Sequence, residues 1–165
     1  MQTNWIAWVL TNFAFVMFIL AIIFIIVNRV VSRSKSAEIV YRWIALFALG
    51  VSGIYAFIMH ALFPNLTAAS IGWAVSPFQY EVAMANLAFG VLGIISFSAS
   101  YGFRLATAIG ATFWLWGDAT GHIYQMVQFQ NFAPGNAGSW FWMDILVPLI
   151  LLICVFNLKP KSMFI

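Results

Sequence analysis

Residues 5–31 read WIAWVLTNFAFVMFILAIIFIIVNRVV, an apolar run long enough to cross a lipid bilayer as one helix. Four further apolar runs follow, at residues 40–63, 77–100, 103–128 and 141–158. The chain has 165 residues, of which 64% are hydrophobic and only 7% are charged, and this composition excludes an ordinary soluble domain. Five helices with short connections use up the length. The sequence therefore predicts an all-α, polytopic membrane helix bundle of about five transmembrane helices, forming a single integral membrane domain over residues 1–165.

The basic residues predict how this bundle is oriented. With five spans, every Lys and Arg falls on one side of the membrane: Arg29, Arg33, Lys35, Arg42, Arg104, Lys159 and Lys161. The positive-inside rule makes that side the cytoplasm, so the N-terminus is predicted outside and the C-terminus inside. We expect a multi-pass protein of a cell inner membrane whose main partner is the lipid bilayer. The basic residues are too few and too dispersed to indicate nucleic-acid binding.

The clearest local signal precedes the third span. Ser76-Pro77-Phe78-Gln79 has the pattern of a capping box, with Ser76 as the N-cap, proline in the first helical position and Gln79 in the third. This pattern predicts that the third span begins at Pro77. It also predicts that residues 64–76, which follow a helix-ending proline, form an outer loop.

Glycines at helical spacing predict close contacts between helices. Gly50 and Gly53 fall in the second span, and Gly117-x-x-x-Gly121 falls in the fourth. Residues without a bulky side chain let helix backbones approach one another in a membrane. We therefore expect helix neighbours against both pairs of glycines.

The main functional clue is a group of five ionisable residues near the predicted outer ends of four spans: His60, Glu81, Asp118, His122 and Asp144. A helical rise of about 1.5 Å per residue places them roughly 6 to 16 Å below the outer surface. Asp118 and His122 project from one helix face, because residues four apart align. Ionisable groups at such a depth usually face the protein interior.

Two imidazoles and three carboxylates form a nitrogen and oxygen ligand set that suits Zn, Fe or Mn. The sequence thus predicts a buried His/carboxylate site near the outer leaflet that binds a metal ion or a small ligand, with all five residues in contact with it. Asn86, Tyr124 and Gln125 would hydrogen-bond to the ligating groups. If the site is catalytic, a metal would activate water or polarise an oxygen, with Glu81 or Asp118 as the base.

Other interpretations of the same residues stay open. His60 can bond a loop carbonyl, and Asp144 can complement a helix dipole. Asp118 has no basic residue nearby, so a proton-coupled transporter or channel, with Asp118 and His122 exchanging protons, is a second hypothesis, and it requires a homo-oligomer. An accessory subunit of a larger membrane redox complex is a third, with haem held by His60 and His122. Haem ranks below a divalent metal because three carboxylates share the zone.

Two segments carry a resemblance to known proteins. Residues 72–81, GWAVSPFQYE, and residues 116–125, WGDATGHIYQ, resemble a family of small uncharacterised prokaryotic multi-pass membrane proteins, a similarity that covers residues 40–158. The stretch from Glu81 to Gly90 is also similar to DoxX-like small helical membrane proteins, some of which associate with quinone-linked oxidoreductases. Neither resemblance implies a defined activity. The first implies that the motif segments hold Glu81, Asn86, Asp118, His122 and Gln125.

Overall fold

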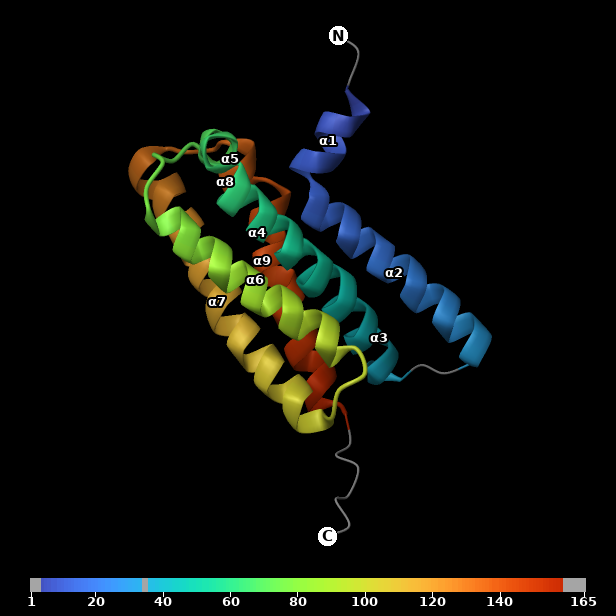
Figure 1. The fold of residues 1–165 in the computed structure, drawn as a ribbon. Helices are drawn as coiled ribbons and strands as arrows, with labels where there is room; N and C mark the ends of the chain where they lie inside the picture. Colours follow the sequence, from blue (N-terminus) through green and yellow to red (C-terminus); the bar gives the residue numbers. More distant parts are fainter. Residues whose placement is uncertain (1–3, 34–35, 159–165) are drawn as a thin grey trace.

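The computed structural model describes residues 4–33 and 36–158, and this part of the chain contains helices and no strand. In chain order the elements are α1 (Trp5–Thr11), α2 (Phe13–Ser32), α3 (Ala37–Trp43), the π-helix η1 (Ile44–Val51), α4 (Ser52–Leu62), α5 (Pro64–Ile71), α6 (Phe78–Ser96), α7 (Tyr101–Phe129), α8 (Pro134–Ala137) and α9 (Ser139–Phe156) (Figure 1). The predicted all-α class is confirmed.

Four helical segments in the described residues are long and apolar enough to cross a membrane: Phe13–Ser32, Ala37–Leu62, Phe78–Ser96 and Pro134–Phe156. They overlap four of the five predicted spans, and they indicate a membrane protein. The first predicted run, residues 5–31, does not form one helix, because the chain breaks at Asn12 between α1 and α2. The remaining predicted span forms α7, which has 29 residues and is long enough to cross. It is less apolar than the other four because it carries Arg104, Asp118 and His122.

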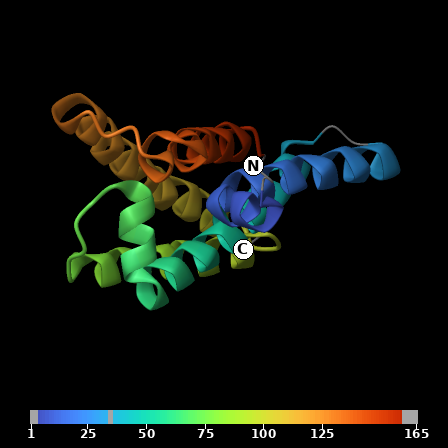
Figure 2. The ribbon, with the colours of Figure 1, turned by 90° about the horizontal axis from the view of Figure 1, so that it is seen from above.

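The long helices pack as two pairs. The continuous rod formed by η1 and α4 lies along α6, and α7 lies along α9. Figure 2 shows these pairs as two layers that diverge from each other, with α2 at one side. Helix α2 contacts η1, α3 and α9 and leaves about half of its apolar side chains exposed, as a lipid-facing helix does. The first span therefore packs beside a bundle formed by the others.

Glycines bring α6 into backbone contact with η1 and α4. A Cβ atom at Gly53 would lie 2.8 Å from the Gly90 Cα, and one at Gly93 would lie 2.9 Å from the Gly50 Cα. No side chain fits at such distances, so small residues are required on both helices. The contact predicted for Gly50 and Gly53 is confirmed.

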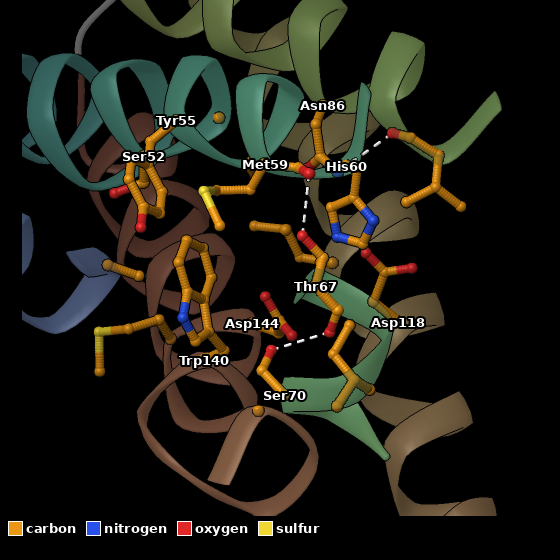
Figure 3. Close-up of a pocket in the computed structure, with 18 of the residues that line it drawn as sticks. Ser52, Tyr55, Met59, His60, Thr67, Ser70, Asn86, Asp118, Trp140 and Asp144 are labelled. Atoms are coloured by element: carbon orange, nitrogen blue, oxygen red, sulfur yellow. Dashed lines mark hydrogen bonds between the residues drawn. The ribbon is translucent and has the colours of Figure 1, made fainter. Parts of the chain in front are cut away.

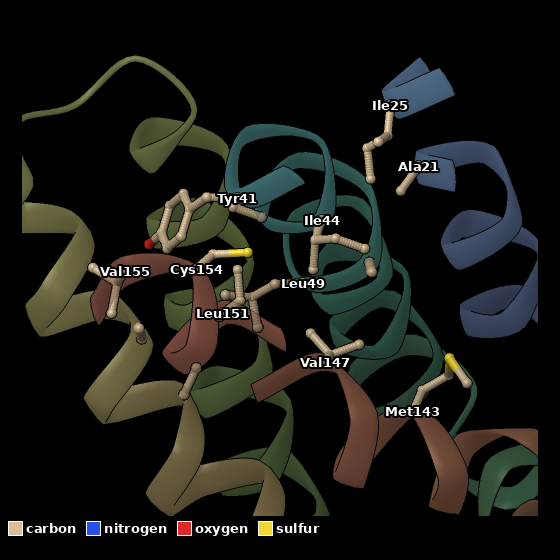
Figure 4. Packing of buried hydrophobic residues seen from close by; sticks show 14 of the residues in the cluster. Ala21, Ile25, Tyr41, Ile44, Leu49, Met143, Val147, Leu151, Cys154 and Val155 are labelled. Atoms are coloured by element: carbon tan, nitrogen blue, oxygen red, sulfur yellow. The ribbon is translucent and has the colours of Figure 1, made fainter. Parts of the chain in front are cut away.

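The apolar core joins α2, α3, η1, α7 and α9, and several of its largest side chains lie towards the end of the bundle away from α5 and α8 (Figure 4). Its largest fully buried apolar side chains come from α3, η1 and α9: Tyr41, Ile44, Val147, Leu151 and Val155. Cys154 is a free, buried cysteine within this cluster.

Arg104 joins three helices at the same end. Its Nε donates to the Ser96 carbonyl at 3.0 Å, and its Nη1 contacts Glu38 Oε1 at 3.0 Å. The Arg104 carbonyl accepts a hydrogen bond from the buried Tyr41 hydroxyl at 2.8 Å. Arg104 is only 6% exposed, so this basic residue has a structural role as well as a topological one. The predicted basic residues Lys35, Lys159 and Lys161 lie outside the described residues.

The predicted capping box is wrong. Helix α6 begins at Phe78, one residue later than predicted, and no side chain caps its N-terminus. The Gln79 Nε2 instead donates to the Pro64 carbonyl at 2.9 Å, because α5 brings that carbonyl close. The predicted outer loop at residues 64–76 is also wrong in its first half. Pro64 ends α4 but also begins α5, since proline suits the first position of a helix.

Candidate functional site

A cavity of about 690 Å³ lies between the two helix pairs. It extends from Ala48 and Leu49, near the middle of the η1–α4 rod, to His122 and Gly135 near the α5 and α8 end. Most of its lining is apolar and aromatic. Its volume falls within the range of roughly 300 to 1,000 Å³ that is typical of small-molecule sites in proteins.

The cavity brings together most of the predicted site residues. His60 from α4, Asp118 and His122 from α7, and Asp144 from α9 line it, together with Asn86 from α6. Figure 3 shows the labelled members of this group directed into the cavity from four different helices. We call His60, Asp118, His122 and Asp144 the polar cluster. The sequence predicted these four residues, together with Glu81, near the same ends of the spans, and the fold brings the four to one space.

Glu81, Tyr124 and Gln125 do not line this cavity. Glu81 is exposed on α6 and lies five residues before Asn86, which corresponds to about 140° around a helix of 3.6 residues per turn. It therefore faces away from the cavity that Asn86 faces. Tyr124 is 58% exposed and lies two residues after His122, which turns it to the opposite face of α7. Depth along a helix predicted these positions, whereas direction around the helix excludes Glu81 and Tyr124 from the cavity. Gln125 lies on the same face of α7 as Asp118 and His122, but nearer the end of that helix, and it does not line the cavity.

His122 is held by an asparagine that sequence reasoning missed. Asn136 is fully buried, and its Oδ1 lies 2.8 Å from His122 Nδ1. The same oxygen accepts a hydrogen bond from Trp73 Nε1 at 3.1 Å, while the Asn136 amide nitrogen donates to the carbonyls of Asn131 and His122. An indole nitrogen can only donate, so the amide oxygen must face it. It follows that His122 Nδ1 carries a hydrogen and donates it to Asn136.

This arrangement fixes what the other imidazole nitrogen can do. His122 Nε2 lies 3.7 Å from Asp144 Oδ2, within ion-pair distance but beyond a normal hydrogen bond. In a neutral imidazole with a hydrogen on Nδ1, Nε2 is an acceptor. A carboxylate is also an acceptor, so the contact between His122 and Asp144 is favourable only when one of the two carries an added proton.

Several polar atoms of the cavity lack partners in the described residues. Asp118 lies one turn before His122, and its carboxylate makes no hydrogen bond or ion pair with any of the described residues. His60 Nδ1 and Trp114 Nε1 are buried and have no hydrogen-bond partner there. Both residues line the cavity. Buried polar groups in folded proteins are nearly always paired, so two unpaired nitrogens beside the cavity are an unusual feature of this site.

Gly117 and Gly121 make room for the cavity. A Cβ atom at Gly117 would meet no atom within 4 Å, and one at Gly121 would meet only Trp73 Cη2, at 4.0 Å. The predicted helix contact at this pair is therefore wrong, although the spacing is typical of one. Both glycines line the cavity, where the absence of side chains leaves open space beside Asp118 and His122.

A short contact positions the segment that carries Asn136. A Cβ atom at Gly135 would lie 2.7 Å from the Ser70 carbonyl oxygen, so α8 packs directly on the backbone of α5. No sequence signal distinguishes Asn136 from the other polar residues of the glycine-rich segment around it. Its role depends on the docking of α8 against α5.

The described residues contain no group of three or more His, Cys, Asp or Glu side chains arranged to hold a metal ion. The predicted five-residue metal site, His60, Glu81, Asp118, His122 and Asp144, thus gains no support from the geometry. Binding of Zn, Fe, Mn or haem stays a prediction.

Comparison with known proteins gives one finding about the family. No curated protein and no solved structure matches the chain. A family model described as a family of unknown function, DUF6790, matches residues 11–162. This match agrees with the resemblance to an uncharacterised family, whereas the DoxX-like similarity and a prokaryotic origin stay predictions. Because the match covers most of the sequence, the chain belongs to the DUF6790 family.

Proposed function

We propose that this protein binds a small, largely apolar molecule with a polar head group in the cavity between its two helix pairs. The observation that carries the proposal is a cavity of about 690 Å³ with mainly apolar walls, into which the titratable side chains of the polar cluster converge. A pocket with apolar walls and a few convergent polar groups is the usual form of a small-molecule site.

The two parts of the cavity suit the two parts of such a molecule. Leu49, Ala56 and Val147 line the apolar part, which would hold a hydrocarbon body. The polar cluster would hold the head group. A molecule of this kind partitions into membranes, so it would reach the cavity from the bilayer.

The test uses a substitution at Gly117, where an added Cβ atom would meet no atom within 4 Å and a larger side chain would occupy part of the cavity. In lipid nanodiscs, the wild-type protein is expected to bind tritiated 1-decanol saturably, above the partition measured with empty nanodiscs. Gly117→Phe should weaken this binding at least tenfold, because the ring would occupy the open space beside Asp118. The measurement is a scintillation-proximity binding assay.

Gly102→Phe is the matched control. Gly102 also lies in α7, and a Cβ atom added there would also meet no atom within 4 Å, but this glycine does not line the cavity. This variant should bind decanol as the wild type does. Equal binding by Gly117→Phe and the wild type, or no saturable binding by the wild type, would refute the proposal.

We also propose that the chain crosses the membrane five times, with α7 as the fifth span, the N-terminus outside and the polar cluster near the outer leaflet. The described arginines support this orientation: Arg29 and Arg33 lie at the end of α2, Arg42 lies in α3, and Arg104 lies in the first turn of α7. All four lie at the end opposite to the polar cluster. The rise of a helix puts Arg104 about 21 Å from Asp118 along α7.

Reporter fusions in a bacterial inner membrane test this topology. Alkaline phosphatase, which is active only outside the cytoplasm, should be active when fused after residue 131, between α7 and α8. It should be inactive when fused after residue 99, between α6 and α7. The reverse pattern would show that the orientation is inverted, and equal activities would show that α7 does not cross.

The transporter, redox-subunit and homo-oligomer hypotheses stay predictions. Each of them is compatible with a molecule held in the cavity. Saturable binding would establish the step that they share, and it would leave the direction of movement or the partner to later experiments.

A further inference from the structure

The charges around the cavity are unbalanced. Its lining includes two carboxylates, Asp118 and Asp144, and two imidazoles, but it includes no Lys or Arg among the described residues. The only ion pairs in this part of the chain join Arg104 to Glu38 and His122 to Asp144. Neither aspartate therefore has a permanent cation beside it there. Placing a charged carboxylate in a low-dielectric site is costly unless a positive charge accompanies it.

Asp144 is the most constrained member of the polar cluster. It is only 9% exposed, its side chain faces the cavity, and it makes no hydrogen bond with any described residue (Figure 3). Its single ionic contact is the 3.7 Å approach of His122 Nε2, which is favourable only with an added proton. The Asp118 carboxylate also acts on Asp144 with a like charge. Both carboxylates would gain from a cation in the cavity.

Three members of the cluster, Asp118, His122 and Asp144, present hydrogen-bond acceptors to the cavity. Because Asn136 takes the hydrogen of His122 Nδ1, the atom that His122 presents towards Asp144 is an acceptor in the neutral ring. The carboxylate oxygens of Asp118 and Asp144 are acceptors as well. A head group that satisfies such a set must supply several N–H or O–H donors.

Aromatic side chains surround the same space. Trp140 stacks with Tyr55 at a ring-centroid distance of 6.1 Å, and Trp114 stacks with Phe89 at 6.3 Å. All four residues line the cavity. Aromatic faces attract cations, especially where water is excluded, and they also pack against hydrocarbon. Aromatic walls therefore suit a molecule that combines an apolar body with a positive charge.

Resting on the proposed binding function, we propose that the molecule held in this cavity is a lipophilic amine, bound as its ammonium ion with the nitrogen at the carboxylates of Asp118 and Asp144. An ammonium supplies up to three N–H donors and one positive charge. The ammonium and one proton shared by His122 and Asp144 together balance the two carboxylates. A carboxylate or phosphate head group would instead meet like charges and acceptors.

The test compares three ten-carbon molecules that differ only in the head group. Tritiated decylamine, which is cationic near pH 7 as alkylamines are, is bound to the full-length protein in phosphatidylcholine nanodiscs. Unlabelled decylamine, 1-decanol and decanoate then compete for the site. We expect decylamine to displace the label at a concentration at least tenfold below that of decanol, with decanoate the weakest.

Substitutions of the two aspartates test whether their carboxylates cause the preference for a cationic head group. Asp118→Asn and Asp144→Asn should each weaken decylamine binding about tenfold while leaving decanol binding nearly unchanged. Glu81→Gln is the matched control, because Glu81 is an exposed acid outside the cavity, and it should bind like the wild type. If an aspartate variant fails to fold, the preference of the wild type among the three head groups decides by itself.

The outcomes separate this inference from the function on which it rests. If decanol competes as well as decylamine, the cavity binds small molecules but does not select an ammonium, and the amine inference is overturned alone. If neither tritiated decanol nor tritiated decylamine binds saturably, both proposals fail. A preference for decylamine that survives both aspartate substitutions would overturn the assignment to Asp118 and Asp144.

Discussion

Asn136→Leu is expected to lower the free energy of unfolding by about 3 kcal/mol, because it leaves buried donors without acceptors. The amide of Asn136 accepts from His122 Nδ1 and Trp73 Nε1 and donates to two backbone carbonyls, and its side chain is fully buried. Leucine has a similar size but can form none of these bonds. Since His122 is also only 9% exposed, water cannot readily replace the lost acceptor.

Equilibrium unfolding by sodium dodecyl sulfate in mixed micelles measures this loss. Asn157→Leu is the control, since Asn157 is exposed at the end of α9 and its side chain donates only to the Ile153 carbonyl of its own helix. It should change stability by less than about 0.5 kcal/mol, as surface substitutions usually do. A loss for Asn136→Leu no larger than that of the control would show that the network does not stabilise the fold.

Asn136→Leu is also expected to change binding in the cavity. Without Asn136, nothing in the described residues determines which nitrogen of His122 carries the hydrogen, and Nε2 can become a donor towards Asp144. Decylamine binding should then weaken more than decanol binding does. The stability and binding measurements on one variant thus separate the packing role of Asn136 from its effect on the polar cluster.

Gly53→Val is expected to destabilise the protein by about 3 kcal/mol, the upper part of the usual range for overpacking. A Cβ atom at Gly53 would lie 2.8 Å from the Gly90 Cα and 2.9 Å from the Asn86 carbonyl oxygen. Both contacts are to backbone, so no side chain can move aside. The two helices must separate, which disturbs the whole α4–α6 pair and shifts Asn86 at the cavity wall.

The same unfolding assay measures the effect, with Gly102→Val as the control. Gly102 has no atom within 4 Å of an added Cβ and lies in the first turn of α7, so valine should be accepted there with little change. Gly90→Val should behave like Gly53→Val, because its Cβ would lie 2.9 Å from the Ile54 backbone nitrogen. A Gly53 variant as stable as the wild type would show that this contact is looser than the structure indicates.

The all-α class and the location of four apolar membrane-spanning segments could be predicted well from the sequence. An apolar run has few alternatives to a helix in a membrane, because its backbone polar groups must bond internally. Element boundaries were less predictable where proline had two roles. Pro64 ends one helix and begins the next, so residues 64–71 form α5 where a loop was predicted.

The spacing of glycines did not predict which of them contact a neighbouring helix. Gly50 and Gly53 contact a neighbouring helix, whereas Gly117 and Gly121, at an equally suitable spacing, border open space. A glycine permits close approach but does not attract a helix by itself. Which pair is used depends on where α6 and α9 lie, and these positions follow from the packing of the whole bundle.

The sequence by itself determined the all-α class, four strongly apolar spans, the segregation of arginines from the polar cluster, and the location of His60, Asp118, His122 and Asp144 in the same half of the bundle. These features depend on composition and on distance along a helix, which are local quantities. Only the tertiary structure decided that Glu81 and Tyr124 face away, that Asn136 fixes the hydrogen of His122, and that a cavity separates the helix pairs. Those features depend on rotation around helices and on contacts between residues far apart in the chain, which no local pattern specifies.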